Sequence, residues 1–147
     1  MKNIDIFGDG SCLGNPGVGG WGAILRFESN GKIHEKKLVG GAKLTTNNQM
    51  ELTAVIEALK ALKEPCKVTI YSDSSYVCKG INEWLAGWVL KRFKNVKNPE
   101  LWSEYLLVSK PHSIKAQWVR GHAGHTENEE CDKMAREFAE NLRNGIK

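Results

Sequence analysis

The sequence predicts an α/β protein of one domain, residues 1–147, built on a mixed β-sheet flanked by helices. Two observations support this fold class: strand patterns crowd into about the first forty residues, and helices and strands alternate after them. An antiparallel meander followed by β-α-β crossovers gives a sheet with both strand directions. With 41% hydrophobic and 26% charged residues, the 147-residue chain has the composition of a globular domain with one core.

The first three elements are predicted as strands because apolar and polar residues alternate in them. They are expected at residues 3–9, 21–27 and 33–40, with a hairpin turn at 29–31 (Ser-Asn-Gly) between the second and the third. The first strand is expected to end at Asp9-Gly10, where a glycine-rich loop begins.

Three glycines of that region, Gly17, Gly19 and Gly22, match the dinucleotide pattern G-x-G-x-x-G. A nucleotide site of this kind needs a helix directly after the motif. Here a strand pattern follows, so the sequence favours tight turns over a nucleotide site.

The remaining elements alternate in type. Thr46 and Gln49 form a capping box for a helix, and Gln49 is assigned no role beyond that cap. The expected buried face of this helix consists of Met50, Ala54, Val55, Ala58, Leu59 and Leu62. A strand at 67–72, a broken helical stretch at about 74–90, a helix at about 99–108 and a strand at 114–119 follow.

A second capping box, Thr126 and Glu129, opens the last helix, which is expected to end at Asn144-Gly145. Its expected buried face consists of Cys131, Met134, Ala135, Phe138 and Leu142.

Charge is distributed unevenly along the chain. Lys and Arg number 21 against 17 acids, which gives a formal charge of +4 and a pI of about 8.9. Residues 88–98 hold four cations and no acid, whereas acids gather at 127–140. This pattern favours binding of a polyanion at the basic stretch and of a metal ion at the acidic one.

The sequence has no feature typical of a membrane or secreted protein. No apolar run reaches the roughly 20 residues of a membrane helix, and the N-terminus has the pattern of a strand rather than a signal peptide. The four cysteines lack C-x-x-C spacing, so free thiols in a reducing cytoplasm are expected.

Four carboxylates are candidate metal ligands. Asp9 and Asp73 each follow a β-rich run, and they meet at one edge of the sheet if their strands are parallel neighbours. Glu51 and Asp132 each lie one position past an apolar residue of a helix, where an acid is usually only a rim residue. Converging carboxylates suit hard ions such as Mg²⁺, and two such ions suit displacement at a phosphodiester.

Residues 121–125, GHAGH, join the last strand to the last helix. The H-x-x-H spacing with Cys131 nearby raises zinc as an alternative, but a fourth soft ligand at suitable spacing is missing. A glycine-flanked histidine near a carboxylate cluster favours proton transfer.

Four separated blocks together resemble the type 1 ribonuclease H family: DGSCLGNPGVGGWGAIL (9–25), TTNNQMELTAVIEAL (45–59), YSDSSYV (71–77) and QWVRGHAGHTENEECDKMA (117–135). The resemblance covers essentially the whole chain. It implies the ribonuclease H-like fold, with three antiparallel strands followed by parallel strands in a five-stranded sheet. It also implies an endonuclease that hydrolyses the RNA strand of RNA–DNA hybrids and leaves 5′-phosphate and 3′-hydroxyl ends. A non-catalytic or DNA-directed protein of the same fold is the alternative.

The resemblance implies catalytic residues as well. Asp9, Glu51, Asp73 and Asp132 correspond to the family's metal-binding carboxylates, and His122, the first histidine of the loop, corresponds to its mobile catalytic histidine. Two Mg²⁺ ions are implied in the reacting complex, one at the attacking water and one at the leaving 3′-oxygen. Mn²⁺ is expected to substitute, and the family suggests a monomer.

Substrate-binding residues are implied in the same way. Asn15, Asn47 and Asn48 match amides that read the minor groove, where 2′-hydroxyls distinguish RNA from DNA. Thr46 and Asn98 match residues that grip a DNA phosphate.

Trp84 and Trp88 match aromatics of the DNA-strand channel, although two tryptophans at i and i+4 are more often core residues. The chain departs from the family pattern at Ser75, where Gln is common, and at Leu44, where Arg is common. Its segment from residue 91 to 102 is also shorter than in members with a basic handle, so weaker electrostatic binding is expected. The cations that favour a phosphate-facing role for this segment are Lys91, Arg92, Lys94 and Lys97.

Overall fold

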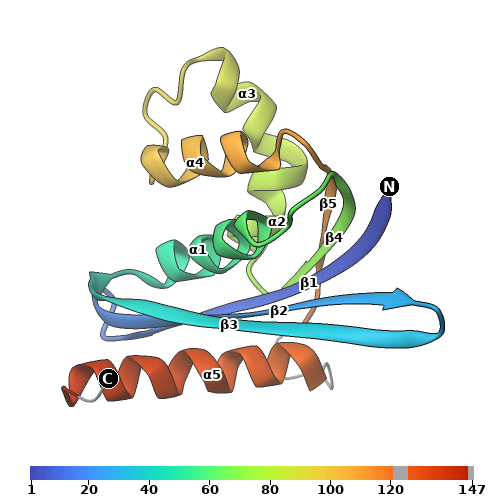
Figure 1. The fold of residues 1–147 in the computed structure, drawn as a ribbon. Helices are drawn as coiled ribbons and strands as arrows, with labels where there is room; N and C mark the ends of the chain where they lie inside the picture. The colour runs from blue at the N-terminus through green and yellow to red at the C-terminus, as the bar shows by residue number, and fades with distance from the viewer. Residues whose placement is uncertain (121–125, 146–147) are drawn as a thin grey trace.

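The structure is a computed structural model that describes residues 1–120 and 126–145. Its sheet has the strand order β3-β2-β1-β4-β5 and carries helices on both faces (Figure 1). The antiparallel meander consists of β1 (Lys2–Leu13), β2 (Gly17–Ser29) and β3 (Lys32–Thr45). β4 (Cys66–Ser72) pairs parallel to β1, and β5 (Ser113–Trp118) pairs parallel to β4. The predicted fold class, a five-stranded mixed sheet, is therefore confirmed.

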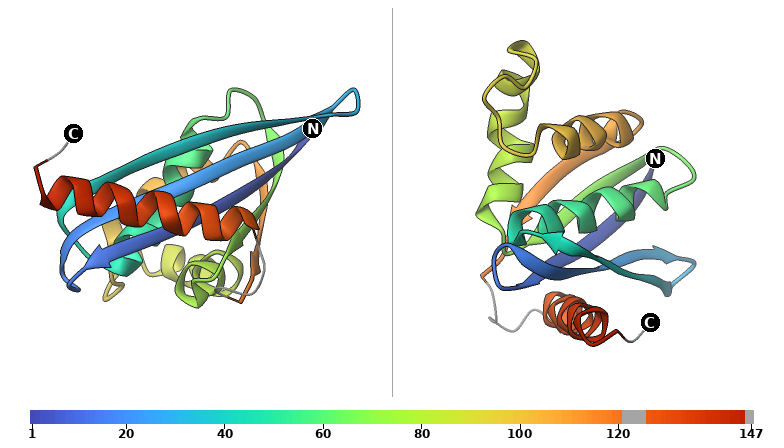
Figure 2. Two further views of the ribbon diagram at one scale, coloured as in Figure 1. Left: turned by 90° about the horizontal axis from the view of Figure 1, so that it is seen from below. Right: turned by 90° about the vertical axis from the view of Figure 1, so that its left-hand side faces the viewer.

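The two faces of the sheet are covered by different helices (Figure 2). α5 (Thr126–Arg143) lies along one face, packed against β1, β2 and β3. α1 (Asn47–Lys60) lies on the other face against β1 and β2, and α4 (Pro99–Ser109) packs on α1. Across the described residues, none of the helices is long and apolar enough to cross a membrane.

The main core lies between α1 and the sheet. The predicted buried face of this helix is confirmed at every position within it, and Leu62, just past its end, is half-buried at the edge of the core. Thr46 caps α1: its hydroxyl accepts from the backbone N–H of Gln49 at 3.2 Å, and the Gln49 side chain accepts from the N–H of Thr46, also at 3.2 Å. The capping box thus marks the start of the helix as predicted.

The glycine-rich region differs from the prediction. β1 continues to Leu13, and β2 begins at Gly17, so the three glycines of the dinucleotide pattern lie inside a strand rather than in turns. The physical reason is the close approach of α5, since a Cβ at Gly22 would lie 2.7 Å from the carbonyl oxygen of Cys131. No helix begins at this motif, which confirms that it is not a nucleotide fingerprint.

The broken helical stretch is a helix whose middle turn is π-helical. It consists of α2 (Ser75–Lys79), η1 (Gly80–Trp84) and α3 (Leu85–Leu90). α3 ends before the cationic run, so these cations lie in turns and are all exposed. We call residues 84–97 the basic handle; α3 projects away from the sheet in the right-hand view of Figure 2.

The last helix keeps the predicted face with small differences. Cys131 and Ala135 are fully buried together with Ala139, whereas the larger side chains predicted beside them, among them Met134 and Phe138, are half-buried. All four cysteines are free, as predicted.

Candidate active site

Three carboxylates from three different elements converge beside the end of β4. Asp9, Glu51 and Asp73 each offer an oxygen, and these oxygens all lie within 4.8 Å of one another. β1 and β4 are parallel neighbours up to the pair Phe7 and Tyr71, which confirms that Asp9 and Asp73 meet. Asp9 is not at a strand end, however, because β1 continues to pair with β2 after β4 has stopped.

Glu51 lies deeper than a rim residue, with 7% of its surface exposed. The cause is Gly10, whose missing side chain lets β1 approach the backbone of α1: a Cβ there would lie 2.6 Å from the nitrogen of Glu51. The N–H of Gly10 donates to Glu51 Oε1 and to Asp9 Oδ1, both at 3.0 Å. Glu51 is therefore not the rim residue that an acid beside an apolar stripe usually is.

Two of the three acids are buried: 6% of the surface of Asp9 and 7% of that of Glu51 are exposed. Burial, with the charges of Asp73 and Asp132, raises the pKa of Asp9 to about 7. Burial and the neighbouring charge of Asp9 raise the pKa of Glu51 well above its ordinary value. Glu51 Oε2 is buried without a hydrogen-bond partner among the described residues. A cation would satisfy these groups together.

The backbone at Asp73 is held by its neighbours. The indole N–H of Trp118 donates to the carbonyl oxygen of Asp73 at 3.0 Å. The hydroxyl of Ser74 accepts from the N–H of Val77 at 3.1 Å and caps α2. Asp73 is thus fixed between the end of β4 and the start of a helix.

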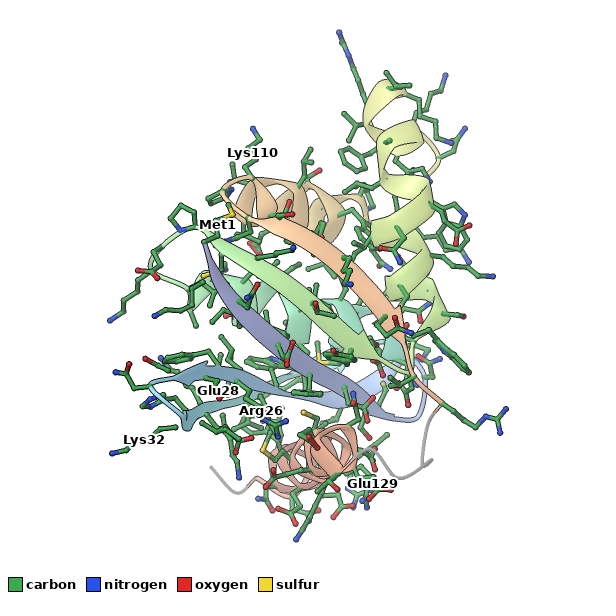
Figure 3. All side chains as sticks on the ribbon, turned by 90° about the vertical axis from the view of Figure 1, so that its right-hand side faces the viewer. Met1, Arg26, Glu28, Lys32, Lys110 and Glu129 are labelled. Atoms are coloured by element: carbon green, nitrogen blue, oxygen red, sulfur yellow. The ribbon has the colours of Figure 1, made fainter. Side chains whose placement is uncertain are left out.

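Asp132 faces the same cleft from α5 but is not one of the three clustered acids. Its Oδ2 accepts a hydrogen bond from Arg136 Nε at 3.1 Å. Arg26 on β2, labelled in Figure 3, forms an ion pair with Glu127 at 2.9 Å, which fixes the first turn of α5 on the sheet. The histidines of the loop, His122 and His125, lie outside the described residues.

The carboxylates open into a cleft of about 500 Å³. Asn47 and Asn48 line this cleft, so the structure brings two predicted minor-groove residues to the acids. Asn15 lies next to them, because its Oδ1 accepts from the N–H of Asn47 at 3.1 Å. The other lining residues are Gly10, Ser11, Cys12, Ser74, Ser75 and Tyr76.

The predicted DNA-strand residues do not line this cleft but lie around it. Trp88 is half-buried, with its ring 5.1 Å from that of Trp102, whereas Trp84 is 39% exposed. Asn98 precedes α4 and donates to the hydroxyl of Tyr76 at 3.0 Å. Tyr76 is not among the residues predicted from the sequence, in which its one signal is its place three residues after Asp73.

A ribonuclease H (RNase H) family model matches residues 1–140 of the chain. The chain belongs to the ribonuclease H family. A relative from Campylobacter concisus named Ribonuclease H is 63% identical over 139 residues, which are 95% of this chain and 94% of that protein. The prediction of a ribonuclease H enzyme is therefore confirmed, and the non-catalytic alternative is not supported.

Solved structures agree with the fold. LC9-RNase H1, described as a type 1 RNase H with the type 2 active-site motif, superposes with a TM-score of 0.88 at 30% identity and covers 96% of this chain and 74% of that one. LC11-RNase H1, solved with an RNA/DNA hybrid, shows the shared fold with a TM-score of 0.66 at 21% identity, and the match covers 95% of this chain and 99% of that one.

Proposed function

We propose that the chain hydrolyses the RNA strand of RNA–DNA hybrids with two divalent ions held by its carboxylates. Asp9, Glu51 and Asp73 would hold the ions together with Asp132, and Mg²⁺ is the proposed ion, with Mn²⁺ able to substitute. The observation that carries the proposal is the convergence of three carboxylate oxygens within 4.8 Å in an open cleft of a ribonuclease H chain.

The residues present fit such ions. The clustered donors are all carboxylate oxygens, which hard divalent ions prefer, and the unpartnered Glu51 Oε2 is available as a ligand. When bound, the ions would supply the positive charge that activates an attacking water and offsets charge on the leaving 3′-oxygen. Asp132, across the cleft, supplies the fourth carboxylate of the proposed set.

The chain's own residues would orient the hybrid. Asn47 and Asn48 carry amide donors and acceptors into the cleft, where they suit the 2′-hydroxyls of the RNA strand. Asn15, tied to the backbone of Asn47, would extend this contact. We assign to His122 the transfer of a proton near the reacting phosphate, on the basis of the sequence.

The DNA strand would lie toward the basic handle, with Thr46 and Asn98 at a phosphate and with Trp84 and Trp88 beside the sugar and bases. The hybrid bound by LC11-RNase H1 supports this class of substrate. We further propose a monomer acting in the cytoplasm, in keeping with four free thiols.

The test compares Asp73→Asn with Asp5→Asn, the same substitution on β1 outside the cleft. Purified proteins are given RNA–DNA, RNA–RNA and DNA–DNA duplexes of one sequence with Mg²⁺. The parent and Asp5→Asn are expected to cut only the RNA of the hybrid, and Asp73→Asn is expected to be inactive while folded. Near-parental cleavage by Asp73→Asn would refute the carboxylate assignment, and cleavage of DNA–DNA would favour the DNA-directed alternative.

A further inference from the structure

Gln49 makes a side-chain bridge that its capping role does not require. Its Oε1 accepts from the N–H of Thr46 at 3.2 Å and from the hydroxyl of Thr45 at 2.9 Å. Its Nε2 donates to Asn98 Oδ1 at 3.0 Å. One amide therefore joins the start of α1 to the residue that precedes α4.

The chain of hydrogen bonds continues past Asn98. Asn98 Nδ2 donates to the hydroxyl oxygen of Tyr76 at 3.0 Å, and the indole N–H of Trp102 donates to the same oxygen at 2.8 Å. The hydroxyl of Tyr76 in turn donates to the carbonyl of Lys97 at 3.4 Å. Trp102 is fully buried, so this end of the hydrogen-bond series is anchored in the core.

At both ends of this series of hydrogen bonds, the chemical groups fix which partner donates and which accepts. A backbone N–H such as that of Thr46 can only donate, which places the oxygen of Gln49 toward it and the nitrogen toward Asn98. An indole N–H also only donates, and a carbonyl only accepts, so Tyr76 presents a lone pair to Asn98. Asn98 must then direct its oxygen to Gln49 and its NH₂ group to Tyr76.

An NH₂ group carries two hydrogens, and Tyr76 takes one of them. The second remains for an acceptor from outside the hydrogen-bond chain. A phosphate oxygen only accepts, so Asn98 suits a phosphate in this orientation and would repel it after an amide flip.

We propose that Gln49 is a positioning residue that fixes the orientation of Asn98 so that this side chain presents N–H to a phosphate of the DNA strand. The inference rests on the proposed function and deepens it. In this proposal Gln49 does not contact the phosphate itself. It acts on the predicted phosphate site through its hydrogen bond to Asn98.

Gln49→Glu tests this role with little change of shape. Glu is a standard residue at this position of a capping box, so α1 should keep its cap and the protein its unfolding midpoint. Its second carboxylate oxygen, however, needs a donor from Asn98. Asn98 must either flip and turn its oxygen toward the phosphate or remain opposed to a carboxylate.

The experiment measures KM and kcat on one RNA–DNA hybrid for the parent, Gln49→Glu, Asn98→Ala and the double variant. Gln49→Glu and Asn98→Ala are each expected to raise KM about tenfold, the effect of one hydrogen bond to a charged group, with kcat within about twofold of the parent. The double variant is expected to match Asn98→Ala, because Gln49 acts through Asn98.

Three results would overturn the inference. An unchanged KM for Gln49→Glu would show that the orientation of Asn98 does not matter for binding. An equal rise in KM in the Asn98→Ala background would show direct repulsion between the new carboxylate and the hybrid. A fall in kcat at unchanged KM would indicate a disturbed active site. If the parent does not cut hybrids, the proposed function fails as well; if it does, these outcomes bear on Gln49 only.

Discussion

The backbone N–H of Gly10 donates to the carboxylate of Glu51 at 3.0 Å and thereby links β1 to α1 at the centre of the site. The same N–H also lies 3.0 Å from Asp9 Oδ1. One donor thus holds the carboxyl groups of Asp9 and Glu51 side by side. The contact is possible because Gly10 has no side chain.

We expect Gly10→Ala to destabilise the protein by about 1–3 kcal/mol and to reduce hybrid cleavage strongly, as overpacking does in a close contact. The new Cβ would lie 2.6 Å from the nitrogen of Glu51 and 2.8 Å from the carbonyl carbon of Met50, both in the backbone of α1. Gly87→Ala is the matched control for the stability measurement, since a Cβ there has open space in α3. Urea denaturation and cleavage assays measure both effects; parental values for Gly10→Ala would contradict the close-contact argument.

Asp9→Asn should make the metal-free protein more stable near neutral pH. Burial raises the pKa of Asp9 from 3.8 to about 7, so between these pH values the folded state keeps a proton that the unfolded state has released. The free energy of unfolding therefore falls as pH rises from about 4 to 7, by at most roughly 1.4 kcal/mol per pH unit for each such proton. Asn has no proton to release, so the variant should lose the share of this slope due to Asp9.

The measurement is urea denaturation at pH 5, 6 and 7 with EDTA, comparing the parent with Asp9→Asn. Asp5→Asn, on the same strand, should keep the slope of the parent. Saturating Mg²⁺ should flatten the slope of the parent at the upper end of this range, because a bound ion stabilises the charged carboxylates. A parent and an Asp9→Asn variant with equal slopes would show that Asp9 does not titrate in this window.

The sequence predicted the meeting of Asp9 and Asp73 because strand order and direction follow from short-range patterns. It could not place Glu51 in the interior, since that depends on the absence of a side chain at Gly10, 41 residues away. The hydrogen bond from Gln49 to Asn98 could not be predicted either, because hydrogen bonds between side chains far apart in the sequence leave no periodic pattern. Local rules therefore predict elements and caps, whereas close approaches between elements need the packed structure.

His122→Ala is expected to slow turnover without abolishing it, whereas His125→Ala should have a much smaller effect. A side chain that carries a proton contributes typically 10²–10⁴-fold, and water can replace part of that contribution. Single-turnover cleavage of one hybrid by both variants, with equal protein folding checked by circular dichroism, measures the difference. A larger loss for His125→Ala would reverse the assignment.

Replacing the four handle cations with Ala should weaken binding and leave kcat at saturation nearly unchanged. These cations are exposed and lie in the turns after α3, so each one that contacts a phosphate contributes about 0.9 to the slope of log K against log salt on a duplex. Trp84→Ala provides an uncharged comparison: Trp84 is 39% exposed, and its loss should weaken binding at an unchanged slope.

A control variant with four exposed lysines removed outside the cleft and the basic handle should keep more of the parental slope. Its substitutions to Ala are at Lys32, Lys36, Lys63 and Lys110. If the handle variant binds with the parent's affinity and slope, the four cations are only solvated surface residues that do not contact the hybrid.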